Sequence, residues 1–563
     1  MSYGYLPIQS PYIFDNLPLF VIIYCIWLFL LLILLTSVER YNNSWEGLAL
    51  SIIFGVIFLG FWSILAPNRV NDGLYNAGTV QYIVSKGTLA WNSNIAYHDY
   101  PGLHIITTFI AQMIGLDVFN SITIILIAVA LVLSSFLYLL FLKFFNNNPF
   151  YAVISVISLI QGTWILSRMA FFYSGYLGLT YIVDFLILLN MNEDTPLSRQ
   201  HGLLVFLLLS GATITHFVTS ISFFFILFGV FIEQKFDDRL FSKNINNHYQ
   251  SSHGLFSLLI LCLLLPLVWI ISWAQNTRDF IIKSLSSFID EFITGKPFDY
   301  LLTLWVSNLG VSIPLWVNII HWIWLIGIYI FGTVLGIFGL INMKIMRFFP
   351  KRDVGVFVGF ILLGITALFV SLRRTEAYRI LMYPPLVLVP MLLWFFLNSS
   401  VRTKNYALSF LLFLLIVTSF PTFLANNNLI TTQAWYSHDF AAPQFLSLSY
   451  GKGKDLTIFT GYDTTPPARY ILSEGFFIRM KPLETLTDQE HVWQELDNFI
   501  TRFETSVGQT QQSVLIYSER TKTPFYHTFS IKPDANEWVQ LEYRLMNFNE
   551  IYDNKYEQLY ALQ

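Results

Sequence analysis

The residues best suited to chemistry are Asp72, His98, Asp99 and His104, which lie in one polar and aromatic stretch, residues 68–104. Hydrophobic segments flank this stretch, so we expect a loop over the mouth of a membrane domain, where the four side chains can converge. A carboxylate there can act as a general base, and carboxylates with an imidazole can bind a divalent metal ion. Asp72 and Asp99 are therefore candidate catalytic residues, Asp72, Asp99 and His98 are candidate metal ligands, and His104 is a further candidate.

These residues also have a structural explanation. Asp72 precedes Gly-Leu-Tyr-Asn-Ala-Gly, which predicts a helix, and Asp is a favoured N-cap residue. The sequence His98-Asp99-Tyr100-Pro101-Gly102 predicts a turn whose aromatic side chains suit the level of the lipid headgroups. The sequence leaves the catalytic and the structural explanation open.

A second candidate group is Arg373, Arg374 and Arg379, three guanidinium groups within one short segment. Arginine prefers bidentate pairing with phosphate, so these residues are candidates for binding a phosphorylated ligand at the outer leaflet. Pairing with Glu376 and with lipid headgroups is the alternative.

Two single residues complete the candidates. Arg168 is a basic residue at a predicted outer face, and His216 lies at a predicted hinge between two apolar segments. For each of them taken alone, a buried and hydrogen-bonded structural role is the simpler interpretation.

The composition is that of a polytopic α-helical membrane protein. Of 563 residues, 55% are hydrophobic and 12% are charged, with 53 Phe and 15 Trp. The net charge of −3 gives no basic excess for binding nucleic acid. The two cysteines, Cys25 and Cys262, both lie in apolar runs, which excludes a disulfide framework and a cysteine metal site.

About twelve segments are apolar over the roughly 20 residues that a membrane span requires. They lie near residues 19–38, 46–66, 120–142, 150–167, 174–191, 201–216, 217–234, 254–275, 314–342, 354–372, 379–397 and 406–424.

The segment Leu103–Leu116 is too short to span and follows Pro-Gly, so we interpret it as an interfacial helix within the first external loop, residues 67–119. With this segment excluded from the spans, the basic loops all fall on one side, which the positive-inside rule makes cytoplasmic. These loops carry Arg40, Lys143, Arg199, Lys235, Arg239, Lys243, Lys344, Arg347, Lys351, Arg352, Arg402 and Lys404. The candidate site then faces the extracytoplasmic side of the cell (plasma) membrane.

Two domains are predicted. Residues 1–424 form the transmembrane domain, and hydropathy falls sharply after it. In residues 425–563, alternating runs such as Leu456–Phe459 and Ser513–Tyr517, separated by a helix-like Asp488–Phe503, predict a small extracytoplasmic α/β domain.

Asp72, then Tyr82-Ile-Val-Ser-Lys-Gly87, then Tyr100-Pro-Gly-Leu103 resembles the first external loop of the GT-C superfamily of integral-membrane glycosyltransferases. This superfamily includes oligosaccharyltransferase subunits, protein mannosyltransferases and lipid A aminoarabinose transferases. In this resemblance Asp72 matches the catalytic Asp, and Asp99 matches the acidic residue before the family's paired prolines.

Further segments carry the same resemblance. Ser167-Arg168 followed by Tyr-Ser-Gly is similar to the second external loop of oligosaccharyltransferases, and the Arg379 region to their lipid-phosphate-binding arginine. The ending, Phe548–Asn554 and then Leu559-Tyr-Ala-Leu, resembles archaeal members. The chain departs from oligosaccharyltransferases in having no acidic pair in Phe171–Gly178, where they keep a metal ligand.

The resemblance implies inverting transfer of a sugar from a polyprenyl- or dolichyl-phosphate donor to an extracytoplasmic glycan, lipid or protein, with Asp72 as general base. Membrane lipids are expected partners. For the cofactor, a divalent metal ion held by Asp72, Asp99 and His98 and no cofactor at all are left as alternatives. The alternatives are an inactive GT-C-like scaffold or a lipid-binding membrane protein. A transporter is disfavoured because the spans hold few ionisable residues, with Asp184 as the main exception, and show no inverted repeat.

Overall fold

A computed structural model gives the structure of the chain. It describes residues 25–26, 29, 43–56, 71–89, 99–162, 174–191, 199–241, 245–279, 281–282, 286, 333–334, 355–363, 366, 383–397, 441–449, 455–460, 477–482, 501–503, 512–518, 545, 549–553 and 557–561.

Most of the described chain is helical. The helices are α2 (Ser44–Gly55), α4 (Asn71–Lys86), α5 (Gly102–Ile114), α6 (Val118–Phe144), α7 (Pro149–Gly162), α9 (Ser174–Met191), α10 (Arg199–Thr215), α11 (Phe217–Phe241), α12 (Ile245–Ser272), α19 (Pro385–Leu397) and α21 (Ala441–Ser449). Two described stretches, Val118–Phe144 and Leu255–Ser272, are long and apolar enough to cross a membrane, and seven shorter helices are apolar.

The predicted spans agree with these helices where the two can be compared. The spans near 46–66, 120–142, 150–167, 174–191, 201–216, 217–234, 254–275 and 379–397 each overlap one helix. In the span near 354–372, residues 355–363 are helical. Most of the spans near 19–38 and 314–342, and all of 406–424, lie outside the described residues. The predicted helices are therefore confirmed in these segments, while their number as membrane spans stays a prediction.

The core of the bundle lies around α6, which packs against α2, α7 and α9. Leu133, Leu137 and Phe141 of α6 are fully buried there with Ile157 of α7 and Val183 of α9. Leu133, Leu137 and Phe141 recur at spacings of four, so they form one stripe along the helix. This stripe holds α6 as the central helix, with its N-terminus beside α5.

Helix α11 and the helical residues 355–363 cross at close range because both carry glycine at the crossing. A Cβ atom at Gly229 would overlap the backbone of Gly355 and Gly359. The Glu233 carboxylate accepts a hydrogen bond from the Gly355 backbone N–H at 3.0 Å. Such backbone-to-backbone packing depends on small residues at the contact.

We expect Gly229→Ala to destabilise the protein by roughly 1 to 3 kcal/mol, because the new methyl group meets backbone atoms that cannot rotate away. Gly202→Ala in α10 is the matched control, since a Cβ there meets nothing within 4 Å. It should leave stability unchanged or raise it slightly. Thermal unfolding of both variants in detergent measures the difference, and equal midpoints would contradict the close crossing.

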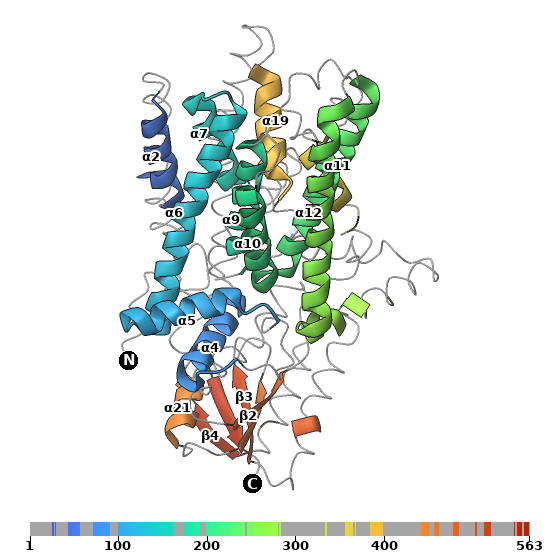
Figure 1. Ribbon diagram of the computed structural model, residues 1–563. Helices are drawn as coiled ribbons and strands as arrows, with labels where there is room; N and C mark the ends of the chain where they lie inside the picture. Colours follow the sequence, from blue (N-terminus) through green and yellow to red (C-terminus); the bar gives the residue numbers. More distant parts are fainter. Residues whose placement is uncertain are drawn as a thin grey trace.

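Helix α5 lies across the end of the bundle, whereas α6 runs along it (Figure 1). Its 13 residues span about 20 Å, too short for a bilayer. Leu103 and Ala111 face inward, while Phe109, Met113 and Ile114 are more than half exposed. This amphipathic helix agrees with the predicted interfacial segment.

The five strands form one sheet at the same end of the bundle as α4 and α5 (Figure 1). The strands are β1 (Asp455–Thr460), β2 (Phe477–Pro482), β3 (Gln512–Ser518), β4 (Asn549–Asp553) and β5 (Glu557–Ala561), in the order β2-β1-β3-β5-β4. Strand β1 pairs parallel with β2 and β3, and β5 pairs antiparallel with β3 and β4. The predicted strands Leu456–Phe459 and Ser513–Tyr517 lie in β1 and β3.

The position of Lys143 fits the predicted topology, in which the basic loops lie at the end of the bundle opposite the candidate site. Helix α6 leads away from α5 to the opposite end of the bundle, and its last turn carries Lys143 (Figure 1). The first external loop and the C-terminal sheet share the other end, as expected from the distribution of basic residues. The compartment that this end faces stays a prediction, and so do the domain boundaries at 424 and 425.

Candidate functional site

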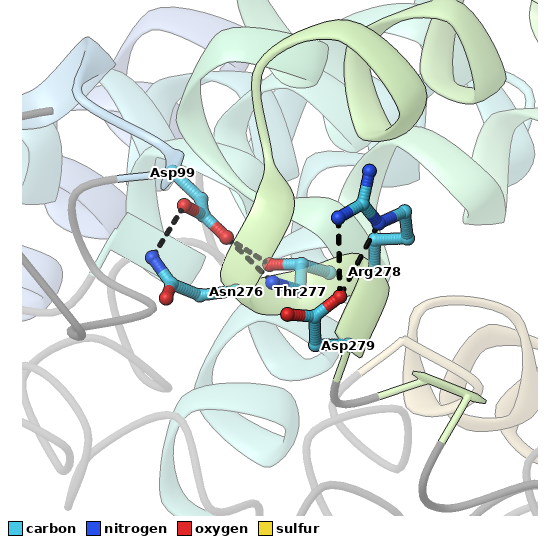
Figure 2. Close-up of polar contacts among 5 residues, drawn as sticks. All are labelled: Asp99, Asn276, Thr277, Arg278 and Asp279. Atoms are coloured by element: carbon cyan, nitrogen blue, oxygen red, sulfur yellow. Dashed lines mark hydrogen bonds and ion pairs between the residues drawn. The ribbon is translucent and has the colours of Figure 1, made fainter. Parts of the chain in front are cut away.

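Asp99 lies at the centre of the best-defined polar cluster in the described chain (Figure 2). One carboxylate oxygen, Oδ2, accepts hydrogen bonds from the backbone N–H of Thr277 at 2.6 Å and from its hydroxyl at 2.8 Å. The other oxygen, Oδ1, accepts from the side-chain amide of Asn276 at 3.0 Å. The backbone carbonyl of Asp99 accepts from the indole N–H of Trp269, also at 3.0 Å. Asp99 is only 3% exposed.

The donors come together because the chain turns directly after α12. The helix ends at Ser272, and residues 275–279 form a separate helical turn. The first N–H groups of such a turn have no partner within it. The Asp99 carboxylate accepts from one of them, that of Thr277, and so caps the turn from a distant part of the chain.

Burial raises the pKa of the Asp99 carboxyl above its ordinary value. The hydrogen bonds from Thr277 and Asn276 favour the ionised form and oppose this effect, while the nearby Asp279 charge adds to it. Burial also raises the pKa of the adjacent Tyr100 hydroxyl.

Arg278 pairs with Asp279 at 3.3 Å in an exposed position beside this cluster (Figure 2).

His104 lies in a different contact, between α4 and α5. Its Nε2 is 2.8 Å from the side-chain oxygen of Asn76, and both residues are about 1% exposed. Asp72 comes one helical turn before Asn76 in α4. The contact therefore joins α5 to the helix that carries the candidate base.

The N-cap explanation of Asp72 needs a correction. Helix α4 begins at Asn71, so Asp72 lies inside the first turn rather than before it. An acidic residue in the first turn is favourable because of the helix dipole. The side chain of Asp72 lies outside the described residues.

A turn was predicted at Pro101-Gly102, but the structure has the start of helix α5 there. Pro101 precedes α5, and Gly102 is its first residue. A Cβ at Gly102 would come within 2.5 Å of the Thr215 hydroxyl and 3.0 Å of the Ile214 carbonyl, at the end of α10. Glycine is thus required for the close approach of α5 to the bundle.

His216 occupies the predicted hinge between α10 and α11 and is 5% exposed. Its Nδ1 is 2.9 Å from the Thr219 hydroxyl, which is 2.9 Å from the Tyr383 hydroxyl. The buried, hydrogen-bonded role expected for His216 is therefore observed. Tyr383 follows Arg379 by four residues, and it is the described residue nearest to the three arginines in sequence.

The remaining candidates, His98, Arg168, Arg373, Arg374 and Arg379, lie outside the described residues. No group of three or more His, Cys, Asp or Glu side chains that could hold a metal ion occurs in the described part of the chain. Oδ2 of Asp99 accepts two hydrogen bonds and Oδ1 accepts one, so Oδ1 keeps room for a further partner. The metal-ligand role of Asp99 stays a prediction.

The interpretation of the sequence missed Trp269, Asn276 and Thr277. Asn276 and Thr277 lie 177 and 178 residues from Asp99 in the chain, so no local pattern joins them. One signal was available. Asn and Thr directly after a long apolar run are typical of a new helical start, and such a start requires a cap.

Comparisons with known proteins identify the fold. No protein-family model matches the chain, and no curated protein matches its sequence. Solved structures do match. An oligosaccharyltransferase from Archaeoglobus fulgidus, in complex with Zn and sulfate, aligns with a TM-score of 0.51 and 12% identity over 84% of this chain and 68% of that chain.

ArnT from Cupriavidus metallidurans aligns in two structures, each with a TM-score of 0.51. The structure bound to undecaprenyl phosphate matches at 11% identity over 91% of this chain and 97% of that one. The apo structure matches at 12% identity over 92% and 98%. Both proteins are GT-C glycosyltransferases, so the fold predicted from the first external loop is confirmed.

Proposed function

We propose that this chain with a GT-C fold is a membrane glycosyltransferase that moves a sugar from a polyprenyl-phosphate-linked donor to an extracytoplasmic acceptor. The observation that supports this most strongly is the alignment over more than nine-tenths of the chain with ArnT bound to undecaprenyl phosphate. The first external loop adds to it, because α4 carries Asp72 and packs against the amphipathic helix α5 at one end of the bundle.

In the proposed reaction Asp72 is the general base. Its carboxylate accepts the proton of the acceptor hydroxyl while that oxygen attacks the anomeric carbon of the sugar. The bond between the anomeric carbon and the phosphate oxygen breaks, and its electron pair stays on the leaving phosphate. Arg373, Arg374 and Arg379 would stabilise the negative charge of that phosphate. Asp99 and His104 support the loop through their contacts with Thr277 and Asn76.

A divalent metal is part of this proposal through Asp72, Asp99 and His98, and the Oδ1 atom of Asp99 accepts one hydrogen bond, from Asn276. When bound, such an ion would supply positive charge next to the phosphate. The oligosaccharyltransferase with the similar fold was crystallised with Zn. Elemental analysis of the purified protein shows whether this chain retains a metal.

We expect Arg379→Ala to weaken binding of undecaprenyl phosphate by roughly 1.5 to 3 kcal/mol, the scale of a hydrogen bond to a charged group. Arg373→Ala and Arg374→Ala test whether the neighbouring arginines share the phosphate. Lys235→Ala is the control. It removes one positive charge from α11, where the ammonium lies 5.7 Å from the Phe231 ring centroid.

The measurement is the rise in thermal unfolding midpoint with increasing undecaprenyl phosphate, compared with undecaprenol. Stabilisation that requires the phosphate and falls in the arginine variants supports the proposal. Equal stabilisation of all three variants and the wild type would show that these arginines contact only bulk lipid headgroups.

A further inference from the structure

We infer that the helical turn 275–279 after α12 positions the first external loop, with Thr277 as the principal positioning residue. The hydrogen bonds of this turn to Asp99 are seen in the structure, whereas their effect on turnover rests on the proposed function.

The turn provides three donors to a single buried carboxylate. Thr277 donates from both its backbone N–H and its hydroxyl, and Asn276 donates from its amide. Thr277 is 6% exposed, so water cannot readily replace its hydroxyl. Trp269 adds a fourth contact from the last turns of α12 to the Asp99 carbonyl. Hydrogen bonds to a charged group are about twice as strong as neutral ones.

These contacts lead directly to the helix with the candidate base. Asp99 is three residues before the first residue of α5, and Gly102 fixes that start against the end of α10. His104, in the first turn of α5, then contacts Asn76 of α4. A shift of the Asp99 segment would therefore move α5 and, through it, α4.

Much of the packing of helix α5 is hydrophobic. Its inward face contacts α4, α6, α9 and α10, while Ile105, Phe109 and Met113 on the other face are exposed. Hydrophobic contacts are non-directional, so an apolar face in lipid does not fix the position of a helix. The directional contacts at Asp99, together with the contact of His104 with Asn76, supply that constraint.

Thr277→Val tests the inference, because it removes the hydroxyl donor while keeping the backbone N–H and nearly the same shape. Thr277→Ser is the matched control, since it retains the hydroxyl. We expect amide hydrogen exchange in residues 71–86 and 102–114 to rise about tenfold in Thr277→Val, while exchange in α6 stays unchanged and Thr277→Ser resembles the wild type. Asn276→Ala removes a different donor and serves if Thr277→Val does not fold.

Turnover gives the second readout. In Thr277→Val we expect kcat to fall about tenfold with little change in KM for the donor, because the base is displaced while the groups that bind the donor are intact. Exchange equal to the wild type in both loop helices would overturn the inference. If the wild type transfers no sugar, the exchange data still decide the positioning role, so failure of the proposed function is distinguishable from failure of this inference.

Discussion

Asp72→Asn should lower the rate of sugar transfer by about 10²-fold or more while the protein folds normally. The amide has the size of the carboxylate and can accept a hydrogen bond, but it cannot take a proton from the acceptor at neutral pH. Asp72 lies in the first turn of α4, where loss of its charge costs only about 0.3 to 1 kcal/mol through the helix dipole. In Asp72→Asn, turnover should therefore fall strongly while stability changes little.

Asp117→Asn is the matched control for Asp72→Asn. Asp117 is the N-cap of α6 in the same external loop, and its side chain accepts from the Asn120 backbone N–H at 3.0 Å. Asn caps a helix as well as Asp, so both stability and turnover should be retained. Transfer of a labelled sugar by purified protein in lipid nanodiscs measures the difference. Transfer by Asp72→Asn at the wild-type rate would exclude Asp72 as the base and favour a scaffold or lipid-binding function.

Asp99→Ala should lower the free energy of unfolding by roughly 3 to 5 kcal/mol, because three donors from Thr277 and Asn276 lose their acceptor in a buried site. Asp99→Asn should be close to neutral. Its amide oxygen can accept from Thr277, and its NH₂ group can donate to Asn276 once that side-chain amide turns over. Thermal unfolding of the two variants at pH 7 makes the comparison.

The difference in stability between the wild type and Asp99→Asn should depend on pH, and the raised pKa of Asp99 fixes its direction. Because burial raises the pKa of Asp99, the protonated carboxyl is favoured in the folded state. Its contribution to stability is complete below the ordinary pKa of 3.8 and is lost as the pH rises through the raised pKa. The wild type should therefore lose stability relative to Asp99→Asn over this window. If the wild type instead gains stability relative to Asp99→Asn as the pH rises, the hydrogen bonds from Thr277 lower the pKa of Asp99 by more than burial raises it.

The amino-acid sequence determined the features that depend on local pattern. Apolar runs of sufficient length indicated the bundle helices, because a helix satisfies its backbone hydrogen bonds within its own segment. The short run after Pro101-Gly102 indicated helix α5, and the hinge at His216 separates α10 from α11 as expected. Alternating residues located β1 and β3. The resemblance carried by residues 72–103, by Ser167-Arg168 and by the Arg379 region indicated the GT-C fold, which the solved structures confirm.

Only the tertiary structure decided which polar residues meet. Asp99 contacts Thr277 and His104 contacts Asn76, and neither partner follows from the local sequence around these residues. The close crossing at Gly229 likewise joins α11 to the helical residues 355–363, more than 100 positions later in the chain. The physical reason is the same in each case. A hydrogen bond or a backbone contact needs atoms within about 3 Å, and which distant segments come that close depends on how the helices pack rather than on any local periodicity.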